Sequence, residues 1–204
     1  MDNHSLNVIY PSEWFANRHA FSWRAFVMGG ALRGVYHPKT YLDAGCAIGD
    51  LVREMQEAGV DSLGIEGSDS VLPHVKGRVV IFDLREPIYL PPCDLCTSFE
   101  VAEHIDPYGT DTYLDNLCRF SNNIVMSICE NLPGRNHVNL QPRSWWDHKM
   151  VDRGYEVDQE AIDAIRIVTK EHAHREEMRW WHERLVVYER NTGTVARRED
   201  DRSM

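Results

Sequence analysis

The sequence KTYLDAGCAIGD, residues 39–50, joins a short apolar run to two glycines spaced four residues apart. The apolar run predicts a β-strand, and the ten residues after the turn predict a helix with Leu51 and Met55 on one face and Gly59 as its stop. Glycine tolerates sharp backbone turns, and the start of a helix offers unpaired N–H groups. We therefore predict a strand-turn-helix unit whose loop can receive a nucleoside.

The alternation of strands and helices continues along the chain. Apolar runs that predict strands lie at residues 62–66, 78–83, 93–99, 123–128, 155–157 and 184–190. Helical spacing is present at residues 12–32, 110–120, 144–153 and 158–182. Such alternation favours a parallel sheet covered on both faces, with ligands at the carboxyl ends of the strands. We expect an α/β protein, a three-layer Rossmann-like sandwich with a mostly parallel seven-stranded sheet, an antiparallel last strand and an N-terminal capping helix.

Length and composition indicate one globular unit. The 204 residues are 43% hydrophobic and 26% charged, which is ordinary for a folded domain. We expect a single domain over residues 1–190, of which residues 1–38 form a helical cap, and a flexible polar tail at 191–204. The sequence has no apolar run of about 18 residues and no charged-then-apolar leader. Its five scattered cysteines suit free thiols. These features predict a cytoplasmic monomer or homodimer without membrane contact.

Acidic residues outnumber basic ones. Lys and Arg number 22 and Asp and Glu number 32, so the formal net charge is 22 − 32 = −10. A surface of this sign repels a phosphate backbone unless a local basic patch overrides it. We therefore expect a small-molecule partner rather than a nucleic acid.

Three acidic residues close three successive predicted strands. Asp43 precedes the glycine turn, Glu66 follows 23 residues later, and Asp83 ends the strand at 78–83. A carboxylate at the tip of the second strand can accept hydrogen bonds from both hydroxyls of a ribose. Asp83 is positioned to meet an adenine amino group. The turn and the three carboxylates together predict a site for a nucleoside.

The glycine turn resembles that of the class I S-adenosylmethionine-dependent methyltransferases. In that family an acidic residue precedes Gly-x-Gly-x-Gly. Here Asp43, Gly45 and Gly49 match, and Ala47 stands at the middle glycine. Ala47 crowds a pyrophosphate more than a sulfonium ligand, and G-x-G-x-x-G is absent, so an NAD-dependent oxidoreductase is disfavoured.

The resemblance extends over about residues 40–130. Glu66 matches the family's ribose carboxylate, Asp83 and Leu84 match its adenine contacts, and CDLCTSFEVAEHI resembles its fourth strand with an E-x-x-E-H end. The match implies S-adenosyl-L-methionine (SAM) as the cofactor. The residues that it implies for the donor site are Asp43, Gly45, Cys46, Ala47, Gly49, Glu66, Gly67, Ser68, Asp83, Leu84, Phe99 and Glu100.

The resemblance is weaker from residue 130 to Arg190. The segments HVNLQPRSWW and LVVYER are similar to family members that act on sugars and other small hydroxylated molecules. We therefore expect methyl transfer to a small acceptor, as O-methylation of a sugar or similar metabolite. The alternative is a non-catalytic or assembly protein that retains the donor-binding fold.

Two histidines are candidates for the catalytic base, because an alcohol acceptor must lose its proton during methyl transfer. His104 follows the fourth predicted strand, and Glu100 or Glu103 could orient its ring; the alternative is a capping or packing histidine. His137 lies in the loop after the fifth strand, and the alternative for it is a solvated loop position.

Other polar and aromatic residues have two interpretations each. Asn139 and Gln141, beside His137, could bind a polar acceptor. The remaining candidates are aromatic. Aromatic residues can either stack on a sugar or pack in a core, so each has two interpretations. Core or sugar contact is open for Trp145 and Trp146, and core or lid is open for Trp14, Phe15 and Trp23.

We predict no metal site. Cys93 and Cys96 lie three residues apart in one predicted strand, which points their side chains to opposite faces. His172 and His174 are two apart on a predicted helix and share no face. With His182 further along, these residues do not form a ligand set.

Overall fold

The seven strands of the chain form one sheet. The structure is a computed structural model that describes residues 3–192, so the expected polar tail lies outside the described residues from 193 onward. The strands are β1 (Thr40–Ala44), β2 (Asp61–Glu66), β3 (Val79–Ile81), β4 (Leu95–Phe99), β5 (Asn123–Ser127), β6 (Tyr155–Val157) and β7 (Leu185–Arg190). Their order is β3-β2-β1-β4-β5-β7-β6, and β1 to β5 are parallel. β7 runs antiparallel to β5 and β6, so the predicted fold class is confirmed.

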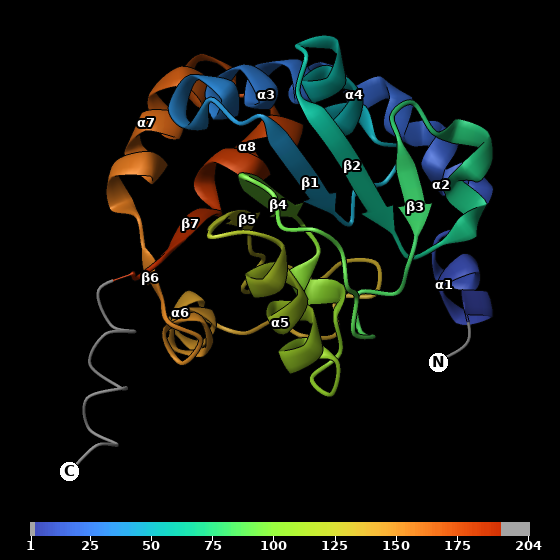
Figure 1. Ribbon diagram of the computed structural model, residues 1–204. Coiled ribbons are helices and arrows are strands. Elements are labelled where there is room, and N and C mark those ends of the chain that lie inside the picture. The colour runs from blue at the N-terminus through green and yellow to red at the C-terminus, as the bar shows by residue number, and fades with distance from the viewer. Residues whose placement is uncertain (1–2, 193–204) are drawn as a thin grey trace.

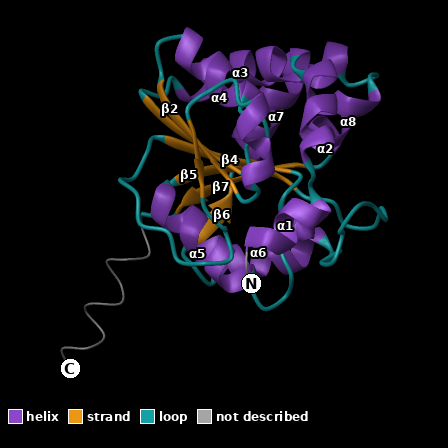
Figure 2. Cartoon of the chain, turned by 90° about the vertical axis from the view of Figure 1, so that its right-hand side faces the viewer, coloured by secondary structure: helices purple, strands orange, loops and turns teal. Residues whose placement is uncertain are grey.

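Helices cover both faces of the sheet (Figures 1 and 2). They are α1 (Asn3–Ile9), α2 (Ser12–Ala16), α3 (Trp23–Tyr36), α4 (Asp50–Glu57), α5 (Thr110–Phe120), α6 (Arg143–Val151), α7 (Gln159–Thr169) and α8 (Glu176–Glu183). Helices α3, α4, α7 and α8 pack on one face, and α5 and α6 pack on the other. Within residues 3–192, no helix has both the length and the apolar character needed to span a bilayer.

The alternation of side chains along each strand builds two separate cores. In β1, Leu42 and Ala44 pack under α5 and α6, whereas Tyr41 points to the face covered by α3 and α4. All five residues of β4 are buried, as expected for a central parallel strand with both faces covered. Because β1 to β5 are parallel, their carboxyl ends share one edge of the sheet, and the loops that follow them meet there.

Two predicted helices are broken in the structure. Residues 12–32 form α2, a 3₁₀-helix η1 (Asn17–Phe21) and α3, and the Ser22 hydroxyl at the junction donates hydrogen bonds to the His19 carbonyl and to Asp50. Residues 158–182 are likewise divided into α7, η4 (Lys170–His172) and α8. The prediction that Asp83 ends the third strand was also wrong, since β3 stops at Ile81.

Candidate functional site

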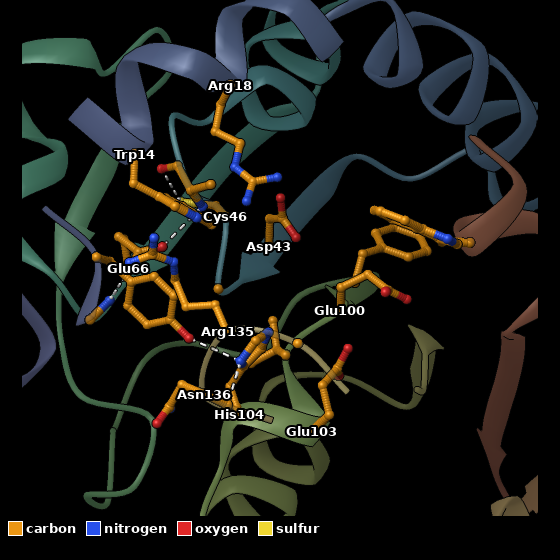
Figure 3. Close-up of a pocket in the computed structure, with 18 of the residues that line it drawn as sticks. Trp14, Arg18, Asp43, Cys46, Glu66, Glu100, Glu103, His104, Arg135 and Asn136 are labelled. Atoms are coloured by element: carbon orange, nitrogen blue, oxygen red, sulfur yellow. Dashed lines mark hydrogen bonds between the residues drawn. The ribbon is translucent and has the colours of Figure 1, made fainter. Parts of the chain in front are cut away.

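A cavity of about 510 Å³ lies at the carboxyl edge of β1, β2 and β4 (Figure 3). The N-terminal segment of α1, α2 and η1 borders it on one side, and the loop after β5 borders it on the other. Both histidines proposed from the sequence, His104 and His137, line this cavity. So do ten of the twelve residues expected at the donor site: Asp43, Gly45, Cys46, Ala47, Glu66, Gly67, Asp83, Leu84, Phe99 and Glu100.

The turn after β1 bends three times through left-handed backbone conformations. Gly45, Ala47 and Gly49 have φ values of 85°, 48° and 74°. A Cβ at Gly45 would collide with the Val101 side chain, so glycine is required there by space as well as by conformation. Ala47 adopts a conformation that costs an L-residue about 1–2 kcal/mol. The bend therefore lets the backbone of residues 45–47 form one wall of the cavity.

Glu66, the last residue of β2, holds this bend in place. One of its carboxylate oxygens accepts hydrogen bonds from the backbone N–H groups of Gly67 and Ser68, at 2.9 and 3.1 Å. The other oxygen accepts from the Ala47 N–H at 3.0 Å. Burial raises the pKa of Glu66, and these hydrogen bonds offset part of that rise. A carboxylate offers about four acceptor positions, so about one remains for a ligand.

Asp43 lies deeper in the cavity wall. Its side chain is buried, and its carboxylate accepts a hydrogen bond of 2.7 Å from the Thr97 hydroxyl, which is itself bonded to the Tyr41 hydroxyl. Burial raises the pKa of Asp43 to about 7, against the lowering effect of the Thr97 bond. Asp43 is therefore poised to change its charge near neutral pH.

Asp83 and Ser68 make hydrogen bonds within the protein that the sequence did not indicate. The Asp83 carboxylate is bound by the Arg85 guanidinium at 2.6 to 3.1 Å. Burial raises the pKa of Asp83, but its hydrogen bonds to Arg85 and the charge of Arg85 outweigh burial and lower it. Ser68 is fully buried and its hydroxyl bonds Asn7 and the Tyr10 carbonyl, so it anchors the N-terminal segment. Gly49, the other expected residue outside the cavity wall, begins α4.

His104 is oriented by groups other than the expected glutamates. It lies in the 3₁₀-helix η3 (Ala102–His104), and its Nδ1 is 2.9 Å from the Tyr10 hydroxyl and 3.1 Å from the Asn136 carbonyl oxygen. Neither Glu100 nor Glu103 hydrogen-bonds the ring; the predicted orienting role was therefore wrong. Burial and the neighbouring His137 lower the pKa of His104 to about 4.

Glu103 and His137 lie next to His104. The two imidazole rings meet edge to face with centroids 4.8 Å apart. The Nδ1 atom of His137 is 2.7 Å from the Leu132 carbonyl oxygen. Glu103 is fully buried, and burial together with Glu100 raises its pKa to about 8. Ligand atoms of Glu103, His104 and His137 all lie within 4.8 Å of one another.

Several residues named from the sequence lie outside the cavity wall. Asn139 is buried and bonds Thr110, and neither it nor Gln141 lines the cavity. Trp146 belongs to the core and Trp145 packs against that core, which selects the packing interpretation for both. Of the proposed lid, Trp14 lines the cavity, whereas Phe15 is fully buried and Trp23 packs against the core.

Residues that carry no sequence motif complete the wall. Trp181 of α8 stacks on Phe99 with centroids 4.5 Å apart. Arg184 donates a hydrogen bond of 2.7 Å to Glu100, which has a φ of 55°. Arg18 of η1 extends into the cavity on the side of Asp43 (Figure 3). Sequence reasoning missed these residues because they come from helices far from the glycine turn.

The cysteines and the late histidines form no cluster. All five cysteines are free. Cys93 lies outside β4, two residues before that strand begins, so the pair with Cys96 is not contained in one strand as predicted. Among the residues that the structure describes, only Glu103, His104 and His137 bring three potential metal ligands together.

The sequence matches no protein-family model and no curated protein. Solved structures do match. A TehB-like SAM-dependent methyltransferase from Corynebacterium glutamicum is 21% identical with a TM-score of 0.61, over 72% of this chain and 84% of that one. The magnesium protoporphyrin IX methyltransferase of Synechocystis with bound SAM is 14% identical with a TM-score of 0.55, over 72% and 75%. With bound S-adenosylhomocysteine (SAH), the alignment to that enzyme covers 58% of this chain and 65% of that one.

A further match differs in its chemistry. The [4+2]-cyclase SpnF is 11% identical with a TM-score of 0.52, over 76% of this chain and 75% of that one. These comparisons establish the fold of class I SAM-dependent methyltransferases for this chain. One fold can carry several activities, so the activity has to be argued from the site.

Proposed function

We propose that the chain is a SAM-dependent methyltransferase that acts on a small hydroxylated acceptor. One observation carries the proposal: the glycine bend and Glu66 face a single cavity at the carboxyl edge of a sheet with this fold. The methyltransferase of Synechocystis, which has the same fold, was solved with bound SAM. The proposed donor residues are those ten that line the cavity, with Gly49 shaping the bend and Ser68 supporting Glu66 through its N–H group.

The residues present fit an adenosine-containing donor. The remaining acceptor position of Glu66 suits one ribose hydroxyl, rather than the two expected from the sequence. Gly45 lines the cavity in a left-handed conformation, so its backbone is exposed to a ligand there. Arg18 makes no hydrogen bond or ion pair with other described residues, so its guanidinium can receive the carboxylate of the donor's methionine part.

The proposed methyl transfer requires little chemical activity from the side chains. The acceptor oxygen attacks the methyl carbon, the carbon–sulfur bond breaks with its electrons left on sulfur, and the hydroxyl proton is released. The sulfonium of SAM activates the methyl group, so the protein mainly holds donor and acceptor in line, which can supply about 7–11 kcal/mol. His104 and His137 are the proposed proton acceptors, because both line the cavity.

The acceptor class follows from the cavity and the charge. The cavity volume of about 510 Å³ suits small molecules, and the net charge of −10 disfavours a polyanionic nucleic acid. A hydroxylated metabolite such as a sugar matches the cluster of carboxylate and imidazole groups at one end of the cavity.

Calorimetry of SAH binding tests the donor site. We expect Glu66→Ala to weaken SAH binding by about 1.5–3 kcal/mol, about 10- to 150-fold, through loss of a charge-assisted hydrogen bond and of the bend. Glu57→Ala is the matched control, because Glu57 is exposed on α4. Equal affinities in the folded variants would refute the role of Glu66.

A second experiment separates turnover from binding. The protein is incubated with methyl-labelled SAM and a panel of sugars, phenols, lipids and cell extract, and labelled products are identified by mass spectrometry. The SpnF cyclase shows that this fold also serves other chemistry. Tight SAH binding without any labelled product would therefore favour the alternative, a protein that uses the fold without methyl transfer.

A further inference from the structure

Glu103, His104 and His137 lie together at the wall of the cavity and pair a buried carboxylate with two half-buried imidazoles. Glu103 and His104 come from η3, whereas His137 comes from the loop after β5. The backbone joins the two segments, because the Glu103 carbonyl accepts hydrogen bonds from the N–H groups of Val138 and Asn139 at 2.9 and 3.1 Å. The main chain therefore holds the two segments together, and the two imidazole rings are also in edge-to-face contact.

The Glu103 carboxylate has no side-chain partner among the described residues. Its side chain is 0% exposed, and only the backbone N–H groups of Glu103 and Cys129 lie near its oxygens, without the geometry of a full hydrogen bond. One oxygen of Glu100 is also buried without a donor, although its other oxygen is paired with Arg184. A buried charge without a partner costs several kcal/mol, so such groups are retained where a ligand completes them.

Each imidazole has one ring nitrogen held by a backbone carbonyl. The Nδ1 atom of His137 is 2.7 Å from the Leu132 carbonyl oxygen, so Nδ1 carries the proton in the neutral ring and Nε2 keeps a lone pair. The Nδ1 atom of His104 lies between the Tyr10 hydroxyl and the Asn136 carbonyl oxygen, and the tautomer in which Nδ1 donates to Asn136 leaves a lone pair on Nε2 as well. An imidazole anchored through one nitrogen to a carbonyl is the arrangement of metal-binding histidines.

We propose that Glu103, His104 and His137 bind a divalent cation of the first transition row, with Glu100 as an additional oxygen ligand. Two imidazoles and a carboxylate suit Mn²⁺, Co²⁺ or Zn²⁺ better than the harder Mg²⁺. A cation about 2.1 Å from each ligand places ligand atoms about 3–4 Å apart. Because the present separations are up to 4.8 Å, small side-chain rotations complete the site.

A cation there also balances the local charge. Arg184 neutralises Glu100, and Glu103 contributes one negative charge when its carboxylate binds a cation in place of a proton. A divalent ion brings the group to a net charge of +1, which favours an oxygen ligand that can lose a proton. This role toward the acceptor hydroxyl rests on the proposed function and is an alternative to direct proton transfer to His104 or His137, because a ring nitrogen bound to the cation cannot accept the proton. Cation binding itself does not depend on the proposed function.

Titration of the untagged protein with Co²⁺ tests the site without substrate or donor. We expect one Co²⁺ per chain with a visible absorption spectrum of mixed nitrogen and oxygen ligation. Glu103→Gln and His137→Gln should each weaken that binding at least tenfold. The matched controls are Glu171→Gln and His148→Gln, because both residues are exposed, and they should bind Co²⁺ as the original chain does.

Stability gives a second readout for the same variants. Mn²⁺ should raise the melting temperature of the original chain but not of Glu103→Gln, because the amide cannot replace the carboxylate as a ligand. The proposal would be overturned if the original chain did not bind one Co²⁺ per chain, or if both folded variants bound Co²⁺ as the original chain does. SAH binding is measured separately by calorimetry, so failure of the cation site can be told apart from failure of the proposed function.

Discussion

Asp43 is a single residue at this site whose burial lowers the stability of the folded chain. Its carboxyl is buried, and one hydrogen bond from Thr97 compensates it only in part. Burial raises its pKa from the ordinary 3.8 to about 7. In the folded chain the carboxyl therefore stays protonated up to near-neutral pH, whereas in the unfolded chain it ionises near pH 4.

The sign of the pH effect follows directly. Between pH 4 and 7 the folded state binds more protons at Asp43 than the unfolded state, so its contribution to stability falls as pH rises. The difference between 3.8 and about 7 corresponds to at most about 4 kcal/mol. We expect Asp43→Asn to match the original chain in stability at pH 4 and to exceed it by a few kcal/mol at pH 8.

Urea unfolding at pH 4, 6 and 8 measures this difference. Asp61→Asn serves as the control, because Asp61 is exposed at the start of β2. A constant offset between Asp43→Asn and the original chain across the three pH values would contradict the buried-carboxyl explanation.

Among the elements, the N-terminal segment supplies the cavity with side chains that the glycine turn does not provide. It brings Tyr10 to His104 and Arg18 to the side of the cavity near Asp43. The Arg18 guanidinium stacks on Trp14, 3.7 Å from the ring centroid, and has no acceptor among the described residues. This segment therefore supplies a positive group to the half of the cavity where the amino-acid part of a donor would lie.

Arg18→Met removes that charge and keeps the apolar stem. We expect it to weaken SAH binding about tenfold or more, because a hydrogen bond to a charged group contributes about 1.5–3 kcal/mol. Binding of 5′-methylthioadenosine, which lacks the amino-acid carboxylate, should change by less than about twofold. Calorimetry with both ligands gives the comparison.

Arg179→Met is the control for this experiment, since Arg179 is exposed on α8. Equal losses for SAH and 5′-methylthioadenosine in Arg18→Met would mean that Arg18 supports the fold of the cavity and does not contact the carboxylate.

The strands were more predictable than the helices that frame the cavity. Apolar runs with β-branched residues predict strands well, as at the half-buried Val79–Ile81 and the mostly buried Asn123–Ser127. The breaks at Ser22 and after Thr169 were missed because helical spacing continues across them and the backbone there keeps helical dihedral angles.

For the whole molecule, the cavity joins residues from nearly the full length of the chain, from Leu6 to Arg184. A ligand that fills it should therefore stabilise the entire cooperative unit. At a concentration 100 times its Kd, a ligand adds about 2.7 kcal/mol, which corresponds to about 5–10 °C in a domain of this size. We expect SAH to raise the melting temperature by this amount, and NAD to leave it unchanged.

Differential scanning calorimetry checks that expectation, with adenosine as a weaker-binding comparison. An equal rise with NAD and SAH would revive the dinucleotide-binding interpretation that Ala47 disfavours. If SAH at millimolar concentration did not raise the melting temperature, the proposal that this chain binds SAM would be refuted.

Local motifs predicted the residues around the glycine bend better than those at the other end of the cavity. Glu66 and Gly45 line the cavity as expected from the sequence, because the positions of both depend on the backbone next to them. The partnership of Asp83 with Arg85 and the meeting of Glu103 with His137 depend on tertiary packing, and no short pattern encodes either. Sequence patterns therefore did not predict the contacts between side chains that come from distant loops.

The common direction of β1 to β5 has a practical consequence for the opposite rim of the sheet. All the loops argued to bind ligands leave from one end of the strands, and the turn of Ala58 and Gly59 between α4 and β2 is exposed at the other. A fluorophore, surface tether or fusion partner attached at Ala58 would occupy the far pole of the molecule. Single-molecule or immobilised assays can thus be built there while the chemistry is left untouched.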